Sequence, residues 1–450
     1  MSTALYWFRK DLRLADNPGL TAASAHERMI LIYIYPQAEE MGAAQYYGLE
    51  HSLEQLSKDL QALGGNLHCL SGVPQTLIPS LVARYHVDAV YWNQCYEPKS
   101  WQQERALTKE LQELGCLTKS FPDNLLNLEP ALLLNQQQQP YRVFTPFYKA
   151  LRFKFSAATC LSVPRLTHAV PLKLREASAT EIGSPERRPL QLPTLGESSA
   201  HQKLHDFINH KLNHYKTKRD IPAANATSQL SPHLALGEIS PRQIYHACSM
   251  IHHQTGVDIE PFIRQLVWRE FSAYILFHFP HILTKNFNSK FDAFPWQSHS
   301  EFLMAWQQGV TGISLVDAGM RELGQTGMMH NRVRMVAASF LTKHLNIHWR
   351  VGEDWFWNAL VDADKASNIV NWQWVAGCGV DAAPYFRIFN PFLQAKKFDP
   401  QGEYICRWVP EARKLPISQR LQTYTQPIID IEEQRKAALE NYKMLGKPLF

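Results

Sequence analysis

The chain has 450 residues, of which 45% are apolar and 19% are charged, and its formal net charge is +5. This length exceeds that of a single typical domain, and the apolar fraction excludes a disordered chain, so two domains with sizeable cores are expected. The modest positive charge is compatible with phosphate-bearing partners, although it also occurs in proteins that bind no nucleic acid.

The cysteines and the N-terminus indicate the compartment. The seven cysteines are Cys69, Cys95, Cys116, Cys160, Cys248, Cys378 and Cys406. An odd number without a Cys-x-x-Cys pair predicts reduced intracellular thiols and no metal site. Charged residues from Arg9 to Arg13 interrupt the N-terminus where a signal peptide would be apolar, and no apolar run reaches membrane-spanning length. We therefore expect a cytoplasmic protein without a membrane partner.

Short apolar runs alternate with amphipathic stretches over residues 1–130. We predict strands at 3–8, 29–35, 67–70 and 89–92, and helices at 44–63 and 100–114. This β-α-β alternation indicates a doubly wound α/β domain with a parallel sheet covered on both faces. No Gly-x-Gly-x-x-Gly motif follows the first strand, so any ligand of this domain is held without the usual dinucleotide fingerprint.

The rest of the chain changes character twice. Residues 131–200 are rich in Gln, Pro and Ser, which predicts an interdomain linker. From 201 to 450 the pattern is helical almost throughout, with predicted helices at 201–215, 241–252, 258–279, 315–345, 355–360 and 428–444. The second domain, residues 201–450, is therefore predicted to be all-α.

The most informative segment runs from Asp362 to Trp374. On a helix Asp364, Asn368 and Trp372 are one turn apart along one face. A carboxylate, an amide and an indole in this arrangement suit a flat aromatic cofactor, because they offer hydrogen bonds to a sugar or ring and an electron donor beside it. The alternative is that Asp362 or Asp364 caps the helix and the aromatic residues belong to a core.

This segment resembles the flavin pocket of the DNA photolyase and cryptochrome family, and five other motifs follow the family's order. They occupy residues 6–18, 227–242, 268–271 with the sequence Trp-Arg-Glu-Phe, 326–335 and, after the pocket motif, 381–391. The resemblance covers nearly the whole chain and is closest to the bacterial cyclobutane pyrimidine dimer photolyases. It implies an α/β antenna domain, residues 1–130, and a helical catalytic domain that binds FAD. The antenna chromophore stays open among methenyltetrahydrofolate, a deazaflavin, FMN and none.

The family pattern implies a set of FAD-binding residues. Hydroxyl and backbone N–H groups ahead of a helix can bind a phosphate without a lysine, although the same residues also form ordinary helix caps. The implied residues are Tyr215, Thr227, Ser228, Gln229, Leu230, Ser231, Arg334, Asp362, Asp364 and Asn368.

A second implied set faces the DNA lesion. Gln265 and Trp268 are three apart on a predicted helix, and such a pair can hydrogen-bond and stack a flipped-out base. Dimer photolyases usually have Glu where this chain has Gln265, and many relatives have Trp where it has Met328. The implied catalytic residues are Gln265, Trp268, Asn331, Met335 and Trp374, and the implied DNA-binding residues are Arg332, Trp268 and Trp374.

Three tryptophans match the family's electron relay, namely Trp296, Trp349 and Trp372. An indole is readily oxidised, so a row of three can pass an electron from the surface to a photoexcited flavin. Taken singly, each is also compatible with a place in the hydrophobic core.

The resemblance therefore predicts a light-driven lyase that repairs cyclobutane pyrimidine dimers in damaged DNA. Photoexcited reduced FAD donates an electron to the flipped-out dimer, and the protein acts as a monomer. The alternatives are a cryptochrome-type blue-light photoreceptor without repair activity, favoured by Gln265 and Met328, and a six-four photolyase. The six-four enzymes have His near Asn331 and Met335, so this chain departs from their pattern, and the absence of a long polar C-terminal tail argues against a cryptochrome.

Overall fold

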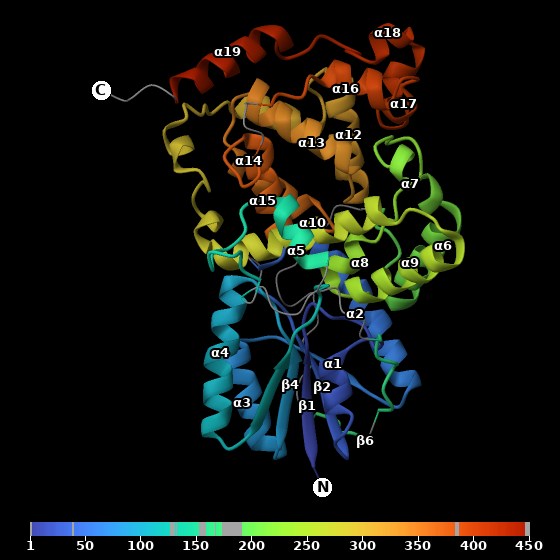
Figure 1. Cartoon of the computed structure of the whole chain (residues 1–450), viewed down its shortest axis with the longest axis vertical. Coiled ribbons are helices and arrows are strands. Elements are labelled where there is room, and N and C mark those ends of the chain that lie inside the picture. Colours follow the sequence, from blue (N-terminus) through green and yellow to red (C-terminus); the bar gives the residue numbers. More distant parts are fainter. Residues whose placement is uncertain are drawn as a thin grey trace.

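The structure, a computed structural model, describes residues 2–37, 40–126, 131, 133–152, 159–166, 168–172, 191–382 and 387–445. It has an α/β domain at the N-terminal end and a helical domain stacked on it (Figure 1). The predicted fold class is therefore confirmed. The limits 1–130, 131–200 and 201–450 stay predictions, and residues 383–386 of the last motif, Phe386 among them, lie outside the described residues.

The α/β domain is built on a parallel sheet with the strand order β3-β2-β1-β4-β5, and β6 pairs with β2. Its elements are β1 (Thr3–Phe8), α1 (Pro18–Ala23), β2 (Arg28–Ile34), α2 (Ala43–Ala62), β3 (Leu67–Leu70), α3 (Pro74–Tyr85), β4 (Ala89–Asn93), α4 (Pro98–Glu113), β5 (Leu117–Phe121) and β6 (His168–Ala169). The chain adds β2 and β3 on one side of β1 and then crosses to β4 on the other side. The topological switch point therefore lies at the carboxyl ends of β1 and β4.

Helices cover both faces of this sheet because successive strand side chains point to opposite faces. Along β1, Tyr6 and Phe8 pack in the same core as the buried leucines of α2, whereas Leu5 and Trp7 pack with those of α3 and α4. All six residues of β1 are buried. A strand buried on both faces has a continuous apolar sequence. Residues 3–8 could therefore be predicted as a strand although apolar and polar residues do not alternate there.

The helical domain has two hydrophobic cores with α15 between them. Its elements, with α5 from the preceding segment, are α5 (Phe144–Arg152), α6 (Glu197–His210), α7 (Leu212–Lys218), α8 (Ser231–Leu236), α9 (Pro241–Thr255), α10 (Glu260–His278), η4 (Pro280–Leu283), η5 (Ser289–Ala293), α11 (Ser300–Gln308), α12 (Ser314–Thr326), α13 (Asn331–Ser339), η6 (Phe340–His344), α14 (Trp349–Ala359), α15 (Lys365–Ala376), α16 (Pro391–Phe398), α17 (Glu403–Trp408), η7 (Pro410–Lys414), α18 (Ile417–Arg420) and α19 (Ile431–Met444). Ile369 and Val370 of α15 belong to one core and Trp372 and Val375 to the other. Residues on α15 are thus held from both sides.

The single helix predicted over residues 315–345 is wrong. It is divided into α12, α13 and η6, a short π-helical turn. Gly327 ends α12 with a φ of +67°, and the His330 side chain then accepts the Arg332 N–H to begin α13. A left-handed residue breaks the run of helical hydrogen bonds, and glycine adopts that conformation at no steric cost.

Candidate functional site

The predicted cofactor motif folds as the start of α15. Asp364 is the N-cap, and its carboxylate accepts the Ser367 N–H at 2.7 Å. Asp364 therefore caps the helix, as the alternative interpretation predicted. Asn368 and Trp372 follow on the helix at successive turns. A cap occupies one carboxylate oxygen, so Asp364 has a structural role in addition to any ligand contact.

Asp362 lies just ahead of this cap and pairs with α13. Arg334 donates to Asp362 Oδ2 at 2.8 Å and to the Met329 carbonyl at 2.7 Å, which fixes the guanidinium. The other carboxylate oxygen, Oδ1, is buried and has no hydrogen-bond partner among the described residues. Because a buried carboxylate oxygen without a donor is costly, this atom fits a site that a ligand's hydroxyl or N–H completes.

Two basic residues missed at the sequence level act on Asp364. Burial alone favours a raised pKa for this carboxyl, but Arg269, Lys10 and the hydrogen bond from Ser367 outweigh it, and the pKa of Asp364 lies below its usual range. Arg269 directly follows Trp268 in the Trp-Arg-Glu-Phe motif, so this motif could have indicated that Arg269 lies near the site. Lys10 comes from the α/β domain, where nothing in the sequence linked it to this site.

The side chain of Asn368 is held by α14. Its amide nitrogen donates to the backbone carbonyl of Glu353 at 3.0 Å and to Glu353 Oε1 at 2.9 Å. Among the described residues no donor reaches the amide oxygen of Asn368, so that acceptor is the end left for a ligand. Glu353 carries no sequence signal for this role, because α14 was predicted only in part.

The predicted phosphate-binding stretch forms the turn that leads into α8. Gln229 has a φ of +55°, Leu230 is the N-cap, and the Leu230 N–H donates weakly to Ser228 Oγ at 3.4 Å. Lys211 of the α6–α7 junction approaches the Thr227 carbonyl at 3.4 Å, and Ser231 is exposed. Tyr215 is buried against Phe207 and Phe262 instead of lying in this turn.

The predicted lesion wall is shared by α10 and α5. Trp268 stacks on Phe144 with ring centroids 3.7 Å apart and an angle of 4° between the planes, so a base can stack only on the other indole face. Gln265 lies one turn before Trp268 and donates to the Pro261 carbonyl at 3.2 Å. Its amide oxygen thus remains the part able to accept a hydrogen bond. Phe144 lies in the segment predicted as an interdomain linker, so its place at this wall was missed.

Trp374 reaches the same region from α15. Its indole N–H donates to the Asp381 carbonyl at 3.2 Å, and the Phe144 N–H in turn stabilises the Asp381 carboxylate. Phe144 and Asp381 therefore bring Trp268 and Trp374 to one wall. Asn331 and Met335 lie one turn apart on α13, with the Asn331 amide 3.8 Å from the Met335 sulfur.

Arg332, predicted to contact DNA, is engaged within the protein. It forms an ion pair with Asp220 at 2.9 Å, and its guanidinium lies 4.4 Å from the ring centroid of Phe398. The side chain is 18% exposed. A phosphate would have to compete with Asp220 for this guanidinium.

The three predicted relay tryptophans lie along one side of the helical core. The partly exposed Trp296 ring is 5.1 Å from His348, whose ring is 5.6 Å from that of the buried Trp349. Trp372 packs across α14 at Gly352, where a Cβ would lie only 2.2 Å from the indole. The absence of a side chain at Gly352 lets α15 bring Trp372 this close to the helix that begins with Trp349.

Metal ligands and membrane helices were searched over the described residues. There, no three His, Cys, Asp or Glu side chains come together in a way that could hold a metal ion. Within the same ranges no helix has both the length and the apolar character needed to cross a bilayer.

Comparisons with known proteins identify the family of the chain. The family model described as the FAD binding domain of DNA photolyase matches residues 262–444, and the DNA photolyase model matches residues 4–166. A deoxyribodipyrimidine photo-lyase of Agrobacterium fabrum is 42% identical, over 98% of each chain. The crystal structure of a bacterial class III photolyase from Agrobacterium tumefaciens has a TM-score of 0.93 and 41% identity, covering 99% of this chain and 98% of its own.

A cryptochrome from Synechocystis sp. PCC6803 is also similar, with a TM-score of 0.89 and 31% identity over 98% of this chain and 99% of its own. The fold and the matched models together define a two-domain FAD-binding protein. The chain belongs to the DNA photolyase family.

Proposed function

We propose that this protein repairs cyclobutane pyrimidine dimers in DNA, using light absorbed by reduced FAD. The observation that carries the proposal is that Trp268 and Trp374 lie at one wall, where Phe144 and Asp381 connect them. Trp374 belongs to α15, the helix that also bears Asn368 and is capped by Asp364. The proposal is supported by the deoxyribodipyrimidine photo-lyase relative, whose name states the substrate of that protein.

The chain's own groups bind and orient the cofactor and the lesion. Asp362, with its unpartnered Oδ1, and the amide oxygen of Asn368 offer hydrogen-bond acceptors, and Arg334 fixes Asp362. Thr227, Ser228 and Ser231 offer hydroxyls for phosphate. When bound, reduced FAD supplies light absorption and the electron that splits the dimer, whereas the protein supplies position and electrostatics.

The residues on α13 favour the cyclobutane dimer over the six-four photoproduct. The six-four enzymes place histidines near the positions of Asn331 and Met335 as proton donors, and neither residue here can donate a proton in that way. His330 faces elsewhere, since its ring caps α13. Splitting a cyclobutane ring by electron transfer needs no such donor, so this site suits that substrate better.

The deciding experiment compares both lesions directly. Purified protein with reduced FAD is incubated under blue light with oligonucleotides that hold either a thymine cyclobutane dimer or a six-four photoproduct, with dark controls. We expect repair of the cyclobutane dimer only. Repair of the six-four lesion, or of neither lesion by protein that retains FAD, would contradict the proposal.

A cryptochrome-type photoreceptor is the second candidate, because Gln265 lacks the carboxyl group usual in dimer photolyases. The Synechocystis cryptochrome, at 31% identity, supports this candidate less strongly than the photo-lyase relative, at 42% identity, supports repair. Absence of repair of either lesion, with intact light-driven reduction of FAD, is the outcome expected for this candidate. On either function we expect a cytoplasmic monomer, with the antenna chromophore still open.

Substituting Gln265 by Glu is expected to raise the repair yield. A protonated carboxyl O–H is a stronger hydrogen-bond donor than an amide N–H, and a hydrogen bond to a charged group is worth about 1.5–3 kcal/mol, so a protonated carboxyl group should better stabilise a base that gains an electron. The measurement is single-turnover repair of a thymine dimer with FAD reduced beforehand. Gln265→Leu serves as the control, since it removes the hydrogen bond and should lower the yield. A lower yield for Gln265→Glu than for wild type would contradict the assignment.

Substituting Arg332 by Ala is expected to weaken binding to damaged duplex DNA and to reduce the slope of log affinity against log salt by about 0.9, the value for one lost phosphate contact. Because Asp220 competes for the same guanidinium, Asp220→Asn should strengthen binding. Binding isotherms at several salt concentrations measure both effects. Equal slopes for wild type and Arg332→Ala would show that Arg332 does not contact the backbone.

A further inference from the structure

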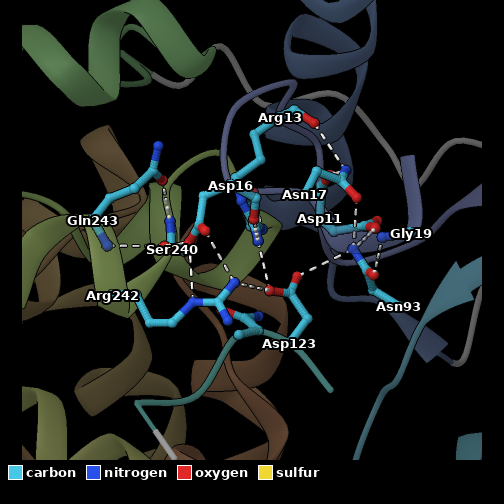
Figure 2. Close-up of polar contacts among 12 residues, drawn as sticks. Asp11, Arg13, Asp16, Asn17, Gly19, Asn93, Asp123, Ser240, Arg242 and Gln243 are labelled. Atoms are coloured by element: carbon cyan, nitrogen blue, oxygen red, sulfur yellow. Dashed lines mark hydrogen bonds and ion pairs between the residues drawn. The ribbon is translucent and has the colours of Figure 1, made fainter. Parts of the chain in front are cut away.

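A buried polar network joins the two domains at the switch point of the sheet. It is formed by Asp11, Arg13, Asp16 and Asn17 after β1, Asn93 at the end of β4, Asp123 after β5, and Ser240 and Arg242 at the start of α9 (Figure 2). Doubly wound domains commonly bind a ligand in this crevice. Here the second domain fills it, because Arg13 also donates to the Gly237 carbonyl at 3.1 Å.

The charges of this network are paired, with one exception. Arg242 binds Asp16 through two nitrogens, each at 3.1 Å, and Arg13 binds Asp123 at 2.6 Å. The remaining nearby cations, Arg9 and Lys10, form their own ion pairs with Glu104 and Glu97. Asp11 is 1% exposed, and among the described residues no cation pairs with it. An isolated buried carboxylate is costly, which favours the neutral, protonated form of Asp11.

Backbone contacts fix the orientation of the two amides around Asp11. Asn17 Oδ1 accepts the Leu20 N–H at 3.0 Å, and its nitrogen donates to the Arg13 carbonyl at 3.0 Å. Asn93 Oδ1 accepts the Gly19 N–H at 3.1 Å, so the Asn93 nitrogen faces the network. Since backbone N–H and carbonyl groups have fixed roles, neither amide can be reversed without losing these bonds.

The remaining hydrogens can satisfy the acceptors in two arrangements, one with Asp11 ionised and one with Asp11 protonated. The Tyr6 hydroxyl is hydrogen-bonded both to Asp11 Oδ2, through a very short contact, and to Asn17 Oδ1 at 2.8 Å. The Asn93 nitrogen has two hydrogens for Asp11 Oδ2 at 2.8 Å, Asn17 Oδ1 at 2.9 Å, Tyr6 Oη at 3.1 Å and Asp123 Oδ2 at 3.3 Å. With Asp11 ionised, Tyr6 donates to Asp11 and an Asn93 hydrogen goes to Asn17 Oδ1. A proton on Asp11, donated to Tyr6, lets Tyr6 donate to Asn17.

We propose that Asp11 holds a proton in the folded protein on the acid side of neutrality, and that losing it leaves an unpaired charge between the domains. The network is then a pH-sensitive clamp. The groups that face Asp11 are Tyr6 of β1, Arg9 and Arg13 of its own loop, and Asp123 after β5. Neither Tyr6, whose pKa is raised well above its usual range by burial and by Asp11, nor the guanidinium groups titrate near neutral pH.

The direction of the pH effect follows from linkage. The pKa of Asp11 is raised to about 6, first by burial and also by Asp123, against the hydrogen bonds from Tyr6 and the Arg9 N–H and the charge of Arg13. An aspartate in an unfolded chain has a pKa of about 3.9. The stabilisation from this group is therefore complete below about pH 3.9 and is lost as the pH rises through about 6.

Asp11→Asn tests the proposal, because an amide supplies the hydrogen to Tyr6 at every pH and still accepts the Arg9 N–H. Infrared difference spectra between acid and neutral pH of full-length wild-type protein should show a carboxylic acid C=O component with a midpoint near pH 6, and this component should be missing from Asp11→Asn. Asp88→Asn, an exposed carboxylate that accepts the Thr3 N–H at 2.7 Å, is the matched control and should keep the component. From about pH 5 to about pH 8, the wild-type folding equilibrium constant relative to Asp11→Asn should fall about tenfold. Either a wild-type difference spectrum without such a component or a component that persists in Asp11→Asn would overturn the proposal.

Discussion

Replacing Trp372 by Phe is expected to slow light-driven reduction of oxidised FAD by at least about tenfold, which corresponds to about 1.4 kcal/mol in the barrier. Phenylalanine fills most of the indole's volume but is far harder to oxidise. Trp372 is buried between Gly352 and the ring of Phe356, with its centroid 5.0 Å from that of Phe356. Repair by FAD reduced beforehand should continue, because that electron travels from flavin to dimer.

Both quantities are measured on one preparation. The rate of photoreduction is followed by absorbance with an external reductant present, and repair is followed after chemical reduction in the dark. Trp101→Phe is the control, since Trp101 packs against Phe277 at the edge of α4 and has no part in the proposed relay. Wild-type photoreduction by the Trp372→Phe protein would show that the relay assignment is wrong, whereas loss of both activities would indicate a damaged pocket.

Replacing Gly237 by Ala is expected to disrupt the packing of the two domains, unlike the same change at Gly256. Both glycines end helices with nearly equal φ, +74° and +73°, so an alanine is similarly strained at either position, by about 1 kcal/mol. A Cβ at Gly237 would lie 1.9 Å from the Lys10 carbonyl oxygen, whereas a Cβ at Gly256 meets nothing within 4 Å. The contact at Gly237 is with backbone, so the Lys10 loop itself must move.

The comparison isolates the interdomain contact from the backbone strain. Gly256→Ala should lose about 1 kcal/mol of stability, and Gly237→Ala should lose at least a further 1–3 kcal/mol, roughly the cost of overpacking a close contact. Chemical denaturation of both variants gives the difference, and limited proteolysis reports whether the domains separate. Equal stability losses in the two variants would mean that the Lys10 loop accommodates the extra methyl group, and that Gly237 is needed only for its backbone conformation.

The Gly237 contact and the Asp11 network depend on the same loop. Residues 10–13 follow β1 and contact α8, since the Leu12 N–H donates to the Leu236 carbonyl at 3.2 Å. Lys10 lowers the pKa of Asp364 from this loop as well. A change in the docking of the α/β domain is therefore felt at the predicted cofactor site, through the charge of Lys10 and through direct contact, because Gln45 of α2 donates to the Ala363 carbonyl at 2.6 Å.

The sequence by itself determined the architecture and the motif that begins α15. Strand β1 could be recognised because burial on both faces requires an unbroken apolar run, and α10 because its apolar residues repeat with the helical period. Strand β5 was missed, since the edge strand Leu117–Phe121 is only partly buried and has little apolar signal. The break between α12 and α13 was missed because one glycine in the left-handed conformation leaves the surrounding helical pattern intact.

The partners of the predicted site residues were decided only by tertiary structure. Nothing local indicates that Phe144 stacks on Trp268, or that Glu353 holds the amide of Asn368, because each pair joins elements that approach only in the folded chain. The lack of an ion-pair partner for Asp11 was likewise decided only by tertiary structure. The chemistry of Asp11 depends on which arginines are already paired with Asp16 and Asp123, and spacing along the chain does not encode that pairing. Periodicity records which face of an element is buried, whereas the identity of the neighbour is set by how the elements pack.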